Sequence, residues 1–139
     1  MSPMSGKDAS ELEEANLIFP GSNLVWERLV DEGVGHGFDL WNKSALVSRW
    51  YRVEADAVDI HAWYRSQLTS RGWAVGPSSQ DGSMDVYVKE GLPRKNFDVV
   101  ISGRANERPW WAGWPPGAEH LPGLFYEIAL KVTTVPSGG

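Results

Sequence analysis

The chain of 139 residues contains no cysteine, no long apolar run and no excess of basic side chains. Without cysteine there is no disulfide framework, no thiolate nucleophile and no zinc–thiolate site. No apolar stretch approaches the roughly 18 residues that a membrane-spanning helix needs. We therefore expect a chain that folds around an ordinary hydrophobic core and has no membrane span.

Acidic side chains outnumber basic ones by 18 to 13, which gives a formal net charge of −5. Proteins that bind duplex nucleic acid draw most of their affinity from neutralised phosphates, and they need a basic surface. The charge balance therefore argues against duplex nucleic acid as a partner. The first residues are polar and then acidic, whereas a secretory signal is basic and then apolar, so we expect a cytoplasmic protein.

Apolar residues make up 42% of the chain, which suits a single globular domain. The acidic segment 1–15 lacks apolar periodicity, and the glycine-containing end 136–139 should fray, so both are predicted to be flexible tails. The predicted domain is residues 16–135. Within it, residues 16–44 fit either a short helix or an irregular strand that contains Val25.

Residues 56–71 have the periodicity of an amphipathic helix. The stripe on one helical face consists of Ala57, Ile60, His61, Tyr64 and Leu68. Asp56 is the predicted N-cap, and Gly72 stands where a left-handed C-terminal cap is needed. In such a cap the residue after the glycine packs on the last turn, so Trp73 is predicted to contact Leu68.

Strands are predicted on both sides of this helix, because apolar and polar residues alternate there with period two. They cover about residues 45–53, 73–75, 84–88, 97–101 and 124–133. Short turns between neighbours favour antiparallel pairing. The predicted fold class is α+β: a mostly antiparallel sheet of four to five strands with one main helix on one face, in the order β-α-β-β-β-long loop-β.

The end of the helix carries the pattern Tyr-x3-Leu-x3-Gly-Trp, formed by Tyr64, Leu68, Gly72 and Trp73. This pattern resembles the helix end of small bacterial α+β proteins of uncharacterised function. The resemblance covers about residues 45–103. It implies a strand, a helix and then a meander, together with a bacterial source, and it brings no catalytic residues.

Residues 104–123 form a long stretch without a predicted helix or strand. Connections beyond about 12–15 residues without secondary structure are uncommon and are often functional. Prolines stiffen the segment, and its tryptophans offer a large rigid recognition surface. The candidate ligand- or partner-binding residues are Arg104, Arg108, Trp110, Trp111, Trp114 and His120. The alternative is a core lid, in which the segment folds back over a bare face of the sheet.

The sequence shows no catalytic, cofactor or metal-binding motif. The glycines around His36 do not match a dinucleotide fingerprint, and neither a Walker lysine nor a His-Glu-x-x-His pattern is present. His61 lies on the helix stripe, where a hydrogen-bonded core histidine is expected. We therefore predict no catalytic residues, no cofactor and no metal.

Three functional hypotheses follow. The leading one is a non-enzymatic binding module that uses the sheet face or residues 104–123 to hold a protein partner or a second copy of itself. A rival is a small hydrolase in which His36, Asp39 and His120 converge. A third is an aromatic platform for a sugar or for single-stranded nucleic acid.

Overall fold

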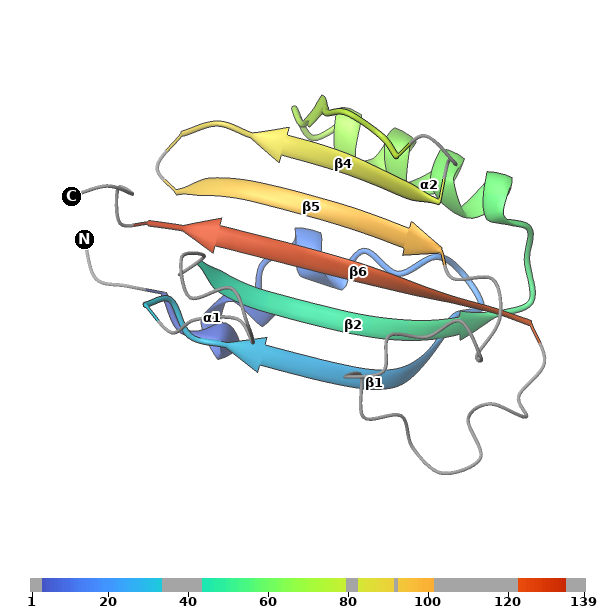
Figure 1. Ribbon diagram of the computed structural model, residues 1–139, viewed down its shortest axis with the longest axis horizontal. Coiled ribbons are helices and arrows are strands. Elements are labelled where there is room, and N and C mark those ends of the chain that lie inside the picture. The colour runs from blue at the N-terminus through green and yellow to red at the C-terminus, as the bar shows by residue number, and fades with distance from the viewer. Residues whose placement is uncertain (1–3, 34–43, 80–82, 92, 102–122, 135–139) are drawn as a thin grey trace.

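One antiparallel sheet of six strands forms the centre of the molecule, in the order β1-β2-β6-β5-β4-β3 (Figure 1). The computed structural model describes residues 4–33, 44–79, 83–91, 93–101 and 123–134. The strands are β1 (Asn23–Val30), β2 (Ala45–Val53), β3 (Ala74–Val75), β4 (Met84–Lys89), β5 (Arg94–Ile101) and β6 (Leu124–Thr133). The helices are α1 (Gly6–Ser10), the 3-10 helix η1 (Glu14–Asn16) and α2 (Ala57–Thr69). The α+β class is confirmed, with six strands instead of the predicted four to five.

The additional strand is β1, so residues 23–30 of the ambiguous segment form a strand and not a helix. It pairs with β2 from Asn23 opposite Arg52 to Val30 opposite Leu46. The register shifts between Leu24 and Trp26, so β1 contains one extra residue and is bulged there. Its residues are exposed or half-buried along the whole strand. This explains why β1 shows no clean apolar alternation in the sequence.

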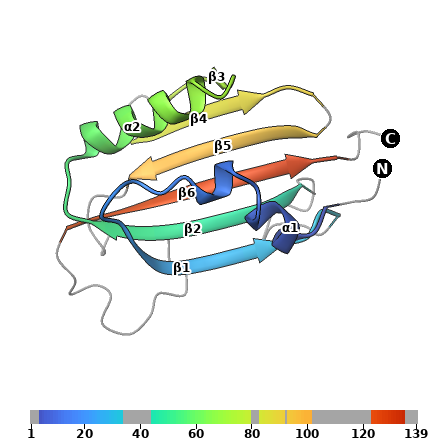
Figure 2. The ribbon, with the colours of Figure 1, turned by 180° about the vertical axis from the view of Figure 1, so that it is seen from behind.

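Helix α2 follows Asp56 and lies over the β5 and β4 side of the sheet (Figure 2). Asp56 occupies the N-cap position with an extended backbone, but its side chain makes no capping hydrogen bond. Ile60, Tyr64 and Leu68 are fully buried, which confirms the predicted stripe. The helix is therefore positioned by packing on the sheet more than by its cap.

The end of α2 is a Schellman cap, as the sequence predicts. Gly72 has φ +86°, and its amide donates to the Thr69 carbonyl over 3.1 Å. The Trp73 amide donates to the Leu68 carbonyl, also over 3.1 Å. The cap turns the Trp73 ring into the core, where it meets the ring of Phe97 edge-on with centroids 6.1 Å apart.

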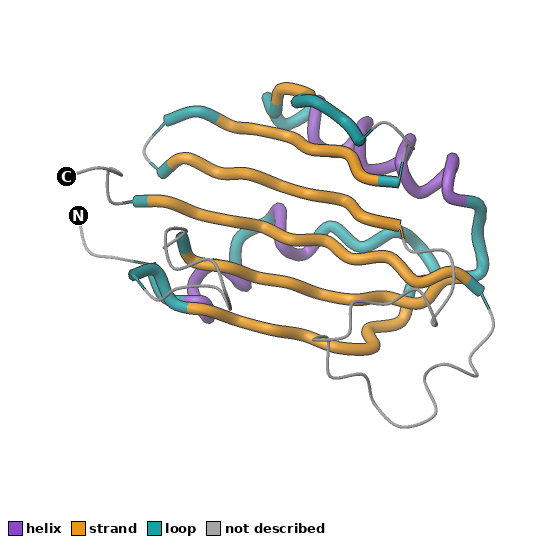
Figure 3. Tube along the Cα trace, viewed as in Figure 1, coloured by secondary structure: helices purple, strands orange, loops and turns teal. Residues whose placement is uncertain are grey.

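Residues 4–19, called the N-terminal strap below, cover the part of the same face that α2 leaves open. The strap runs over β1, β2 and β6 and contains the single turns α1 and η1 joined by loops (Figures 2 and 3). Ala9 and Ala15 in it are fully buried, and Leu17 is nearly so. The tail expected for residues 1–15 is therefore a packed element from residue 4 onward. Its short turns bury single residues at irregular spacing, so no periodicity reveals it.

The strap, with α1 and η1 in it, and helix α2 lie on one face of the sheet, which we call the inner face (Figures 1 and 2). The main core lies between them and the sheet. Its sheet residues include Val47, Tyr51, Tyr87, Phe97, Val99, Tyr126, Ile128 and Leu130. The opposite face, called the outer face, is covered by no helix of the described residues and faces the viewer in Figure 1.

Candidate functional site

The candidate residues of the long loop lie outside the described part of the chain. They are Arg104, Arg108, Trp110, Trp111, Trp114 and His120. His36 and Asp39 of the hydrolase hypothesis lie outside it as well. Both the recognition and the hydrolase hypotheses therefore stay predictions.

The strands beside these segments leave the sheet at opposite ends. Residues 34–43 lead into β2 at Ala45, which pairs with Val132 near the end of β6. Residues 102–122 lead into β6 at Leu124, which pairs with Val53 at the other end of β2. A nine-residue strand spans about 27–30 Å. A hydrolytic site would thus have to draw its groups from chain segments anchored that far apart.

His61 is the one histidine within the described residues, and it lies between α2 and β4. Its Nδ1 is 2.9 Å from Asp85 Oδ2, but neither ring nitrogen has a well-aligned hydrogen bond within the described residues. Asp85 Oδ1 accepts a hydrogen bond from the Ser78 hydroxyl over 2.9 Å. His61 therefore contacts Asp85 across the boundary between helix and sheet, without the well-aligned hydrogen bonds expected of a core histidine. Within the described residues no three His, Asp or Glu side chains form a group that could hold a metal ion.

The outer face carries an apolar strip that the sequence pattern did not place. Tyr87 is 1% exposed and faces the core, so its neighbours in alternation, Met84, Val86 and Val88, point to the outer face. Pairing puts Val100 of β5 opposite Met84 of β4. All four side chains are half-buried. We call them the outer strip.

A second apolar group lies on the outer face of β1, β2 and β6. Trp50 and Phe125 are 2% and 1% exposed, and Val25 and Trp26 pack against them. Strand register connects this group with the outer strip. One row of opposed residues crosses the face from β1 to β4 and consists of Trp26, Trp50, Glu127, Val100 and Met84.

Two carboxylates lie where the aromatic group meets the outer strip. Glu127 stands opposite Trp50 on one side and Val100 on the other, and Asp98 is its diagonal neighbour on β5. The Ser48 hydroxyl donates a hydrogen bond to Glu127. The two acids thus share one small area of the outer face with a hydroxyl and large apolar side chains.

Both carboxyl groups are less acidic than usual. Burial raises the pKa of Glu127, and the nearby Asp98 charge raises it further, while the hydrogen bond from Ser48 opposes the shift. Burial also raises the pKa of Asp98, against the attraction of Lys131. Ionised carboxylates with little hydration gain most from a cationic donor that approaches them. Perturbed acids among apolar side chains are a common mark of a binding site.

Comparison of the chain with protein-family models, curated proteins and solved structures found no match. None of the helices in the described part of the chain has the length and apolar character needed to cross a bilayer. Function has to be inferred from the outer face and its surroundings.

Proposed function

We propose that this protein is a non-enzymatic interaction module, and that it binds a protein partner through the outer face together with residues 104–123. The row from Trp26 through Trp50 and Glu127 to Met84 is the observation that carries the proposal. Interfaces between proteins combine aromatic anchors with a few polar groups that are shielded from water. The half-buried members of this row, Trp26, Glu127, Val100 and Met84, have that composition, and the buried Trp50 is packed against Trp26.

The described residues at the two ends of segment 102–122 support the same surface. The segment joins Ile101 to Gly123, and Ile101 follows Val100 of the outer strip. Gly123 has φ +98°, and a Cβ on it would lie 2.5 Å from the Val53 carbonyl oxygen. The chain therefore re-enters the sheet through a close backbone contact at a fixed point. Three tryptophans and four prolines between these ends suit a pre-ordered recognition loop.

The charges of the site indicate the chemistry of the partner. Burial keeps the pKa of Asp98 and of Glu127 raised, although Lys131 attracts both carboxylates and Arg28 attracts Glu127. A lysine or arginine side chain from a partner would add to this cationic environment and offset more of the cost of burying the two charges. We expect the partner to present basic residues amid an apolar surface.

The experiment compares three variants of the tagged protein as bait, with chemical cross-linking and mass spectrometry to identify bound proteins. Val86→Arg places a charge on the outer strip, and the triple change of Trp110, Trp111 and Trp114 to Ala removes the loop aromatics. Val58→Arg on α2 is the matched control, because Val58 is 76% exposed and lies off the buried stripe. Circular dichroism verifies that each variant is folded.

A partner recovered with the wild type and Val58→Arg, but lost with the other two folded variants, supports the proposal. Equal recovery with Val86→Arg would exclude the outer face as the interface. Unfolding of the triple tryptophan variant would show that residues 104–123 belong to the core, as the lid interpretation holds.

A further inference from the structure

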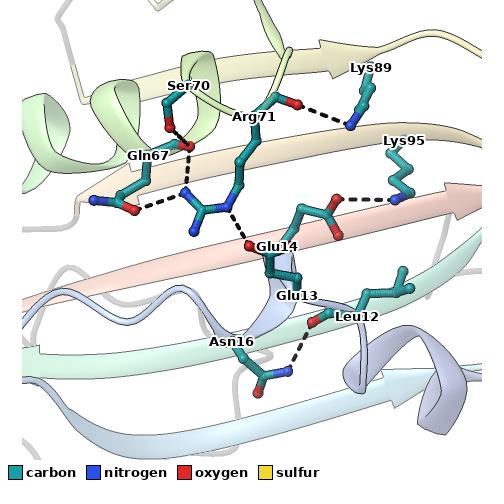
Figure 4. A network of polar contacts seen from close by, with 9 residues as sticks. All are labelled: Leu12, Glu13, Glu14, Asn16, Gln67, Ser70, Arg71, Lys89 and Lys95. Carbon is teal, nitrogen blue, oxygen red and sulfur yellow. Dashed lines mark hydrogen bonds and ion pairs between the residues drawn. The ribbon is translucent and has the colours of Figure 1, made fainter.

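The strap has more acidic than basic side chains. Basic side chains from separate elements of the fold pair with its acidic residues. Lys95 of β5 lies with its Nζ 3.1 Å from Glu14 Oε1 (Figure 4). Arg71, just after α2, places its Nε 2.7 Å from Glu13 Oε1. The first of these pairs is shielded, since the side chains of Lys95 and Glu14 are 16% and 9% exposed. The surface that receives the strap, which we call the strap groove, is therefore matched to it in charge.

The strap groove also binds the strap through its main chain. Arg49 of β2 donates from Nη1 to the Ala15 carbonyl over 2.6 Å, and its Nε bonds to Glu27 over 2.6 Å. The Tyr64 hydroxyl donates to the Leu17 carbonyl over 2.8 Å. Main-chain hydrogen bonds, charge pairs and small apolar side chains are together the means by which proteins recognise peptides. The strap is bound as a peptide ligand would be.

On its C-terminal side the strap continues into β1 through the turn at residues 20–22. Within this turn the Ser22 amide donates to the Phe19 carbonyl over 3.1 Å, and Gly21 has φ +87°. At the other end Met4 is held by non-covalent contacts. Its amide donates to Glu32 Oε1 and its carbonyl accepts from the Glu32 amide, each over 2.8 Å. A groove with these contacts cannot distinguish its own strap from the strap of another molecule.

We propose that the strap groove takes the strap of a second copy of this chain, so that two molecules exchange residues 4–19 reciprocally and form a dimer. Every contact between the strap and the strap groove recurs in that dimer, whereas the turn at residues 20–22, with its Ser22–Phe19 hydrogen bond, has to open. Exchange of an identical element is a low-cost route to a symmetric dimer. The covalent connection favours the closed monomer until the protein concentration approaches the effective concentration of the tethered strap.

A charge-reversal pair tests the exchange. Glu14→Lys puts two lysines in contact within one molecule, and Lys95→Glu puts two glutamates there. When the two variants are refolded together, exchange brings the lysine-bearing strap of the first variant to the glutamate-bearing groove of the second. It also brings the unchanged Glu14 of the second variant to the unchanged Lys95 of the first. We expect the mixture to give a heterodimer, at least tenfold enriched over either variant alone in native mass spectrometry. The double variant on one chain should return to the monomer.

The mixture would overturn the proposal if it contained two folded monomers and no heterodimer, or if each variant alone dimerised as strongly as the mixture. A measurement on the wild type avoids any dependence on how the variants fold. Equal amounts of ¹⁴N- and ¹⁵N-labelled protein are refolded together at about 1 mM, near the effective concentration of a short tether. A zero-length carbodiimide cross-link then joins Lys95 to Glu14 where they form their ion pair.

Cross-linked Lys95–Glu14 peptides that combine ¹⁴N with ¹⁵N halves would confirm exchange, because only two different molecules can form them. Exclusively like-labelled peptides would overturn it. The outer face has no part in this cross-link, so the result is independent of the proposed function.

Discussion

The two halves of the inner face are covered in different ways, although both contain fully buried residues. Over β5 and β4, helix α2 presents a regular stripe ending in a glycine cap, with Leu68 fully buried in its last turn. Over β1 and β2, the strap buries irregularly spaced apolar residues such as Ala9 and Leu17, and charged groups from the sheet reach it. The helix is fixed by packing of a periodic apolar stripe. The strap depends in addition on polar contacts with residues far away in the sequence. The difference shows that a core can be closed by a segment with no helical or strand pattern.

Tyrosines join the two halves. The Tyr64 hydroxyl, which comes from α2, reaches the strap at Leu17, and it also lies 3.5 Å from the Tyr126 hydroxyl. Tyr126 in turn shares a 2.6 Å hydrogen bond with Ser22 at the start of β1. Burial raises the pKa of Tyr64 far above its usual value, so its hydroxyl remains a donor at every working pH.

The largest expected effect comes from the half covered by α2. Leu68→Ala removes a fully buried side chain and leaves a cavity, so the free energy of unfolding should fall by about 2–5 kcal/mol. Val58→Ala on the exposed side of the same helix should change it by less than about 0.5 kcal/mol. Urea titration followed by circular dichroism measures both. Equal small losses would show that α2 does not hold its half of the core.

An intermediate effect is expected in the strap half. Lys95→Met leaves Glu14 shielded and without its cation, which should cost about 1.5–3 kcal/mol. Glu13→Gln is the matched control, because Glu13 is 69% exposed where it pairs with Arg71, and such pairs contribute about 1 kcal/mol at most. Thermal unfolding at low and high salt separates them. If the two variants lost the same stability, the shielding of the Lys95 pair would have no energetic consequence.

The smallest effect on stability is expected on the outer face, at Glu127. The raised pKa of Glu127 means that the folded state binds a proton more tightly than the unfolded state. Wild-type stability should therefore fall as pH rises from the ordinary glutamate range through the raised pKa. Glu127→Gln keeps an acceptor for Ser48 and removes this charge. Its melting temperature should exceed that of the wild type at neutral pH, and the gain should shrink in acid. A gain that grows in acid would reverse the assigned direction.

Local sequence features were enough to predict the elements that are determined by residues close together in the sequence. The stripe of α2 and its cap at Gly72 depend on residues about one turn apart, and β6 alternates over ten residues. The α+β class followed from these elements.

Elements that depend on distant partners could not be predicted in the same way. The strap needs Lys95 and Arg49, which are far along the chain, to neutralise and bind it. In β4, the alternation allowed either face to be buried, and the pairing of Tyr87 with Phe97 decides which one is. The outer strip is the consequence of that choice, so the described part of the candidate site was missed together with it. The loop residues, such as Trp110, remain a prediction from composition.

The bulge in β1 has a consequence for how the chain behaves when it is crowded. An open sheet has two edges, and a long flat edge is a template on which further strands can stack into fibrils. Here one edge is β3, with only two residues, and the other is β1, whose ladder is interrupted near Val25. Neither edge offers an uninterrupted row of amides and carbonyls, which works against fibril growth from the ends of the sheet.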